Sequence, residues 1–174
     1  MLKNNYKGFT LMELLVVIAI IGILSSVVLG SLNSARASAL EARAHGQFKT
    51  FQTALELYKN DNAGEYPPDS DRDLPSGMEA YIAGGVWPEG PWPGSVYDWD
   101  NWEDPDVSGA RIYQISVRFC PTGGPLSACV FPDEDWAEDF DIDSAYYFCI
   151  SGNCRSHASQ PVEYPGKCVN CAEE

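Results

Sequence analysis

The chain has 174 residues, of which 45% are hydrophobic, and a formal net charge of −14 at pH 7. The apolar content excludes an intrinsically disordered chain, and the length allows one modest domain with an appendage. The acidic charge is concentrated beyond residue 60, because residues 61–174 carry 22 acidic and 5 basic side chains. Such a surface repels the phosphate backbone, so we expect no nucleic acid among the partners.

The first predicted element is an apolar helix near the N-terminus. Residues 14–35 contain no charged side chain, and as a helix these 22 residues span about 33 Å, close to the thickness of the bilayer's hydrocarbon core. Lys3 and Lys7 flank the N-terminal end, which by the positive-inside rule stays in the cytoplasm. We therefore expect one membrane crossing, with the acidic region outside.

Two other roles for this apolar run remain open from the residues alone. The tripeptide Ala37-Ser38-Ala39 has the form of a signal-peptidase site, which would make the run a cleaved secretory signal, although the run is longer than the usual apolar core of such a signal. The second alternative is a plain signal anchor. In that case Glu13 is a polar residue tolerated because it lies near the membrane interface.

A specific motif precedes the apolar run, namely Lys7-Gly8-Phe9-Thr10-Leu11-Met12-Glu13. Its basic leader, its glycine before phenylalanine and its glutamate four residues further on resemble the class III signal of type IV prepilins and type II secretion pseudopilins. The resemblance implies that a prepilin peptidase removes residues 1–8 by cutting between Gly8 and Phe9, and that it N-methylates Phe9. Residues 9–35 would then be retained as a transmembrane and polymerisation helix.

An ionised carboxylate within an apolar run is costly unless it has a partner. The resemblance implies that Glu13 pairs during assembly with the new N-terminal amine of a neighbouring subunit. The implied partners are further copies of the chain, the prepilin peptidase, the inner-membrane assembly platform and, before assembly, membrane lipid. The implied location is the cytoplasmic membrane for a single-pass precursor with its head outside, and then an extracellular filament or the cell surface.

The helix is predicted to continue beyond the membrane as an amphipathic segment over residues 36–64. Apolar residues recur there at helical spacing, and charged residues lie between them. The apolar positions are Leu40, Ala44, Phe48, Phe51, Leu55 and Tyr58. Gly64 is a suitable C-terminal stop, so we expect a helix of about 50 residues whose second half packs on a head.

Residues 65–174 are predicted to form an acidic globular head that contains disulfides. Residues 65–95 are rich in proline and glycine and are predicted to form a loop. Alternating hydrophobic residues predict strands over 110–119 and 144–150, with a third near Val96. The expected fold class is α+β, with a long N-terminal helix packed on a small antiparallel sheet, as in the pilin head that the resemblance implies.

Cysteines are confined to this head, at Cys120, Cys129, Cys149, Cys154, Cys168 and Cys171. An even number in a small exported domain predicts disulfides, with zinc as the competing hypothesis. The connectivity stays undetermined, although consecutive cysteines form the closest pairs in sequence. Cys168 and Cys171 also have the spacing of a redox motif, but we favour a structural tie for the C-terminal tail.

Acidic loops in the head are candidates for calcium, which prefers oxygen ligands. The preferred ligands are Asp139 and Asp141, with a solvated acidic surface as the alternative. Residues 97–102 interleave aromatic and acidic side chains, as carbohydrate-binding faces do, but core tryptophans are the preferred interpretation. No catalytic set that includes histidine emerges, so we predict that the protein is not an enzyme.

The predicted function is therefore that of a structural subunit of a type IV pilus or of the related type II secretion pseudopilus, polymerising through its N-terminal helix. The alternative is a membrane-anchored extracellular domain that binds or hydrolyses carbohydrate. In this alternative, the apolar helix serves only as an anchor.

Overall fold

The computed structural model describes residues 9–120, 128–132, 137, 146–156 and 166–171. It divides into two compact units, Met1–Ala39 and Leu40–Glu174. The elements in chain order are helix α1 (Leu11–Asp61), the short 3-10 helix η1 (Ala83–Gly85) and strands β1 (Val96–Glu103), β2 (Arg111–Arg118), β3 (Tyr146–Ser151) and β4 (Lys167–Cys168). A long N-terminal helix with a small, mostly antiparallel sheet confirms the predicted α+β class.

The four strands form one sheet in the order β1-β2-β3-β4. β1 and β2 form an antiparallel hairpin, and β3 adds to β2 in the antiparallel sense. β4 pairs with β3 in parallel through two residues, and the sequence pattern did not predict it. The predicted strand regions therefore correspond to β1, β2 and β3. β4 extends the sheet beyond β3 and forms its edge.

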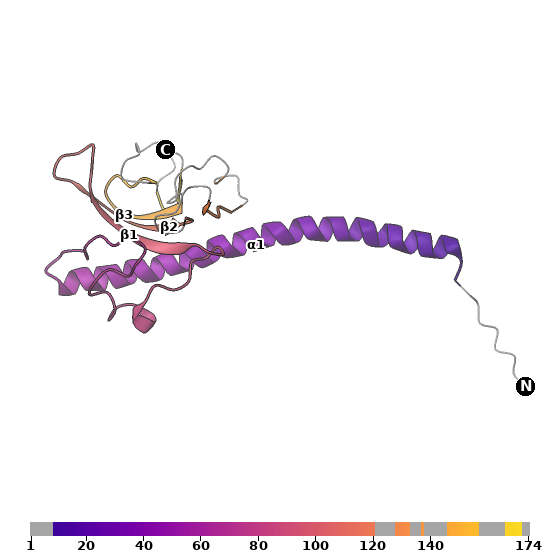
Figure 1. Cartoon of the computed structure of the whole chain (residues 1–174), viewed down its shortest axis with the longest axis horizontal. Coiled ribbons are helices and arrows are strands. Elements are labelled where there is room, and N and C mark those ends of the chain that lie inside the picture. The colour runs from indigo at the N-terminus through magenta and orange to yellow at the C-terminus, as the bar shows by residue number, and fades with distance from the viewer. Residues whose placement is uncertain (1–8, 121–127, 133–136, 138–145, 157–165, 172–174) are drawn as a thin grey trace, which may run out of the picture. The chain divides into compact units, whose positions relative to one another are not determined.

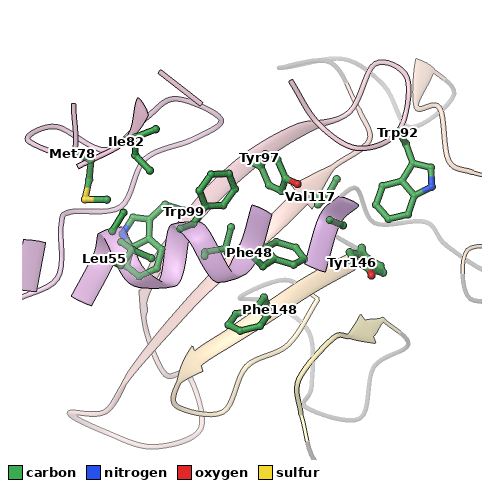
Figure 2. Packing of buried hydrophobic residues seen from close by; sticks show 14 of the residues in the cluster. Phe48, Leu55, Met78, Ile82, Trp92, Tyr97, Trp99, Val117, Tyr146 and Phe148 are labelled. Carbon is green, nitrogen blue, oxygen red and sulfur yellow. The ribbon is translucent and has the colours of Figure 1, made fainter. Parts of the chain in front are cut away.

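The C-terminal part of α1 packs on one face of this sheet (Figure 1). Its buried residues are Ala44, Phe48, Phe51, Ala54 and Leu55. Figure 2 shows Phe48 among aromatic side chains from the strands, with ring centroids 5.7 Å from Tyr97, 6.0 Å from Tyr146 and 5.4 Å from Phe148. Such pairs add to the stability that burial of large rings already gives, so the helical stripe and the strands share one core.

The opposite face of the sheet is buried as well, which the alternating pattern of β2 did not indicate. Gln114 and Ser116 alternate with the hydrophobic residues of β2, yet both are 0% exposed. The Gln114 side chain donates to the backbone oxygen of Arg155 at 2.8 Å and accepts from its backbone N–H at 3.1 Å. A segment after β3 thus covers this face. The alternating pattern of a strand does not show whether another segment covers its polar side.

Two arginines pair with acidic side chains of β1 and of the turn that follows it. Arg118 lies 2.5 Å from an oxygen of Asp98 and 3.2 Å from one of Asp100. Arg155 donates to Asp104 at 3.2 Å and to Asp106 at 2.8 Å. Such pairing offsets the cost of removing charges from water, and it links the β1–β2 hairpin to the segment after β3.

Candidate functional site in the N-terminal segment

The N-terminal part of α1 exposes a continuous apolar surface. All large apolar side chains between Leu11 and Leu32 are 44–81% exposed. The helix is long and apolar enough to cross a membrane, and its most apolar stretch is not buried within the protein. A surface of this kind requires lipid or other apolar protein surfaces around it.

The helix begins with a reciprocal capping arrangement between Thr10 and Glu13. The Glu13 carboxylate oxygen Oε2 accepts hydrogen bonds from the backbone N–H and the hydroxyl of Thr10, each at 2.9 Å. The Thr10 hydroxyl in turn accepts from the backbone N–H of Glu13 at 3.2 Å. This is a capping box, which satisfies donors that the first turn of a helix leaves without partners.

Our sequence reasoning did not identify this role, although its signal is present. Thr10 and Glu13 form the Thr-x-x-Glu pattern that marks a capped helix start. Glu13 therefore has a local partner within its own chain. Phe9 is 82% exposed, and Gly8 lies outside the described residues, so cleavage at Gly8–Phe9, methylation of Phe9 and the assembly role of Glu13 stay predictions.

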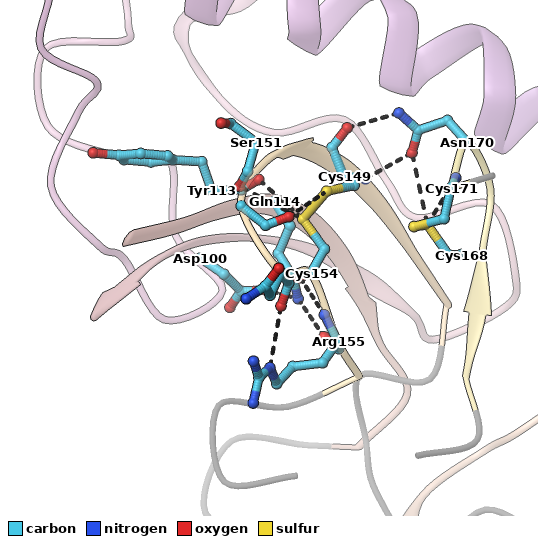
Figure 3. The surroundings of a disulfide bond; sticks show 12 residues. Asp100, Tyr113, Gln114, Cys149, Ser151, Cys154, Arg155, Cys168, Asn170 and Cys171 are labelled. Atoms are coloured by element: carbon cyan, nitrogen blue, oxygen red, sulfur yellow. Dashed lines mark hydrogen bonds between the residues drawn. A yellow bond between two sulfur atoms is a disulfide. The ribbon is translucent and has the colours of Figure 1, made fainter. Parts of the chain in front are cut away.

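All six cysteines are paired with their nearest neighbours in sequence. The disulfides join Cys120 to Cys129, Cys149 to Cys154 and Cys168 to Cys171, with Cα–Cα distances of 4.0, 5.6 and 5.5 Å. The second and third disulfides lie near each other, around the end of β3 and the C-terminal residues 166–171 (Figure 3). The first of these two bonds ties β3 to the chain just after it, and the second closes a short ring at β4.

The run of aromatic and acidic residues in β1 does not form an exposed sugar-binding face. Tyr97 and Trp99 are buried in the core that α1 covers. Asp98 and Asp100 point to the other side of the sheet, where both are buried against Arg118. Trp102, the remaining aromatic residue of the run, is half-buried. The aromatic residues of this run therefore serve as core side chains, which was the preferred interpretation of the sequence.

The candidate calcium ligands Asp139 and Asp141 lie outside the described residues. Within the described parts of the chain, no group of three or more histidine, cysteine, aspartate or glutamate side chains is arranged to hold a metal ion. The calcium site therefore stays a prediction.

Comparison with known proteins gives one family match and several related proteins. Residues 3–29 match the family described as the prokaryotic N-terminal methylation motif. The type II secretion system core protein G of Aeromonas hydrophila is 40% identical over 67 residues, which cover 38% of this chain and 46% of that protein. The Escherichia coli K12 protein of the same name is 38% identical over 77 residues, covering 44% and 52%.

The protein of this name from Vibrio cholerae is 35% identical over 86 residues, covering 49% of this chain and 55% of the relative. The chain thus spans about half the length of the curated relatives that it matches. No solved structure matches significantly.

Proposed function

We propose that this chain, a member of the type IV pilin and pseudopilin family, is a structural subunit that polymerises through α1 into a filament. One observation carries the proposal: the methylation motif of residues 3–29 includes the start of an exposed apolar helix. The relatives named as core protein G of the type II secretion system favour the secretion pseudopilus over the type IV pilus.

Processing is the first step of this proposal. A prepilin peptidase cuts between Gly8 and Phe9 and methylates the new amine of Phe9, so the apolar helix stays on the mature subunit. The precursor spans the cytoplasmic membrane once, with its acidic head outside. The exposed apolar side chains of α1 contact lipid before assembly and the helices of other subunits afterwards.

Glu13 then has two states. In the separate subunit its carboxylate accepts two hydrogen bonds from Thr10, which limits the cost of placing a charge in an apolar segment. In the filament the same carboxylate pairs with the amine of Phe9 in a neighbouring subunit. Pairing of opposite charges in an apolar layer favours one register between adjacent helices, because any other register leaves both charges unpaired.

The capping role and the charge-pairing role can be separated by substitution. Glu13→Gln keeps an oxygen for the capping box but removes the negative charge, whereas Thr10→Ala removes the threonine hydroxyl and keeps the charge. We expect Glu13→Gln and Glu13→Ala to insert and be cleaved normally but to yield at least about tenfold less filament. Thr10→Ala should assemble at near wild-type yield.

Filament yield is measured by shearing cells and quantifying the released subunit against the total cellular amount. Wild-type yield from Glu13→Gln would show that the charge is dispensable. Loss of assembly from Thr10→Ala to the same degree as from Glu13→Gln would instead make the helix cap the important feature.

A further inference from the structure

We infer that the Cys168–Cys171 disulfide is the site at which an external dithiol exchanges with this head. We further infer that this exchange loosens the C-terminal strap, by which we mean residues 166–171. The inference rests on the geometry around β3 and β4 and is independent of whether the chain polymerises.

Access distinguishes this disulfide from the other two. All six cysteines are described, and among them only Cys171 is exposed, while Cys120 and Cys154 are buried and the remaining three are half-buried. Exchange requires a thiolate to reach one sulfur of the disulfide. Of the three bonds, only Cys168–Cys171 includes an exposed cysteine, so we expect a thiolate to reach its sulfur most easily.

The hydrogen bonding at this bond also favours one direction of attack. The backbone N–H of Cys171 donates to the sulfur of Cys168 at 3.1 Å. When an incoming thiolate attacks the Cys171 sulfur, the Cys168 sulfur leaves as a thiolate, and a donor at this distance stabilises its negative charge. A more stable leaving thiolate makes the exchange faster.

The chemical step balances with a dithiol as the reductant. The first thiolate of the dithiol forms a mixed disulfide with Cys171 and breaks the Cys168–Cys171 bond. The second thiolate then attacks the dithiol's own sulfur in the mixed disulfide and releases the Cys171 thiolate. The partner ends as a disulfide, and Cys168 and Cys171 take up the two protons as thiols.

Asn170 connects this bond to the rest of the head. Its side chain accepts a hydrogen bond from the Cys149 backbone N–H at 2.7 Å and donates to the Cys149 carbonyl oxygen at 2.7 Å. Asn170 thereby takes the place of a neighbouring strand for one residue of β3 (Figure 3). Because Asn170 lies inside the ring closed by Cys168 and Cys171, opening that ring frees its backbone and weakens both bonds.

The strap is also held through its other residues. The Val169 N–H donates to the Tyr147 carbonyl oxygen at 2.8 Å, and Lys167 pairs with Glu41 of α1 at 2.6 Å. These contacts tie the strap to β3 and to α1, so a loosened strap uncovers this edge of β3 and the Cys149–Cys154 disulfide beside it. The redox state of Cys168 and Cys171 thus controls how accessible the Cys149–Cys154 disulfide is.

The test uses the full chain in detergent with dithiothreitol as the dithiol probe. Free thiols are trapped at successive times with an alkylating reagent and assigned by peptide mass mapping. We expect Cys168–Cys171 to open at least about tenfold faster than either other disulfide. Opening of Cys149–Cys154 or Cys120–Cys129 first, or of all three bonds together, would overturn the assignment.

The coupling is tested with Asn170→Ala, which leaves every sulfur in place. We expect this change to speed opening of Cys149–Cys154 severalfold and to leave the Cys168–Cys171 rate within about twofold. Asn60→Ala, the same exchange at an exposed position of α1, is the matched control and should alter neither rate. An unchanged Cys149–Cys154 rate in Asn170→Ala would contradict the coupling.

A second measurement tests the hold of the disulfide on the strap directly. The double variant Cys168→Ser/Cys171→Ser imitates the opened strap without a reductant. Hydrogen exchange at the Cys149 and Val169 amides should be faster than in the wild type, while amides in β2 keep their protection. Wild-type exchange at Cys149 and Val169 would show that the disulfide does not hold the strap.

Discussion

Ala63 lies in the left-handed backbone region with a φ of 58°, in the turn that follows the end of α1 at Asp61. Gly64 follows at φ 88°, and its N–H donates to the Lys59 carbonyl oxygen at 2.9 Å, a bond that closes the helix. A residue with a Cβ is strained in this region, whereas glycine is not. Conformational strain is therefore expected at Ala63 and not at Gly64.

Replacing this alanine with glycine should relieve that strain. We expect Ala63→Gly to raise the free energy of unfolding of the full chain in detergent by about 0.5–1 kcal/mol. The same exchange at Ala42, which is exposed within the helix, should lower it by about 1 kcal/mol. Chemical denaturation measures both, and destabilisation of similar size at the two positions would contradict the assignment of strain to Ala63.

Asp100 makes the stability of the head depend on pH. Burial raises the pKa of Asp100 above that of an ordinary carboxyl group, and the charge of Arg118 offsets only part of that rise. Asp98 adds to the rise, while the hydrogen bond from the Gln114 side chain opposes it. The folded state therefore keeps a proton that the unfolded chain has already released.

This stabilising contribution is complete below the unfolded pKa of about 4 and is lost as the pH rises toward the raised folded value. We expect Asp100→Asn to flatten the fall of unfolding free energy between about pH 5 and 7, by up to about 1.4 kcal/mol per pH unit. Asp71→Asn, at an exposed carboxylate, is the control and should leave the slope unchanged. An identical slope in Asp100→Asn and wild type would exclude Asp100 as its source.

At the scale of single residues, the sequence shows which positions are unusual more readily than it shows the side chains with which they pair. Glu13 stands out because it interrupts an apolar run, yet its hydrogen bonds to Thr10 were overlooked. The burial of Arg118 and Arg155 could not be foreseen, because each meets its carboxylates only after the hairpin and the segment after β3 have come together. Pairings of this kind depend on tertiary contacts and leave no local pattern.

Among the elements, α1 was the most predictable and β4 the least. The helix follows from a long apolar run and a regular stripe of apolar residues, and it covers 51 residues, close to the expected length. β4 has two residues, too few to show an alternating pattern. Its position depends on the parallel pairing with β3 and on contacts of the strap, which are long-range in sequence.

The packing of α1 on the sheet gives a direct prediction about the stability of the head. Phe48 is fully buried and contacts three aromatic rings, whereas Leu57 is 53% exposed on the same helix. We expect Phe48→Ala to lower the free energy of unfolding by about 3–5 kcal/mol, because it leaves a cavity in the core. Leu57→Ala should cost less than about 1 kcal/mol.

Near-UV circular dichroism during denaturation follows loss of the aromatic core. A small effect of Phe48→Ala, comparable to that of Leu57→Ala, would mean that α1 does not share the core of the sheet. Because both substitutions lie outside the apolar N-terminal segment, neither is expected to change membrane insertion.

At the scale of the whole molecule, two parts of the chain have opposite characters. The N-terminal segment is apolar and exposed along its length, while residues 61–174 carry 22 acidic and 5 basic side chains around a well-packed core. This division is what a subunit requires if one part assembles within an apolar environment and the other remains soluble. It also explains why the N-terminal motif carried the functional prediction, whereas the head alone indicated no specific activity.

The most direct test of this account is the intact mass of the subunit recovered from sheared filaments. We predict a subunit that begins at Phe9 and carries three disulfides and one methyl group, and fragmentation should place that methyl group on the Phe9 amine. A chain that still begins at Met1, or one that begins at Leu40 after loss of the apolar helix, would contradict the claim that α1 is retained as the polymerisation stem.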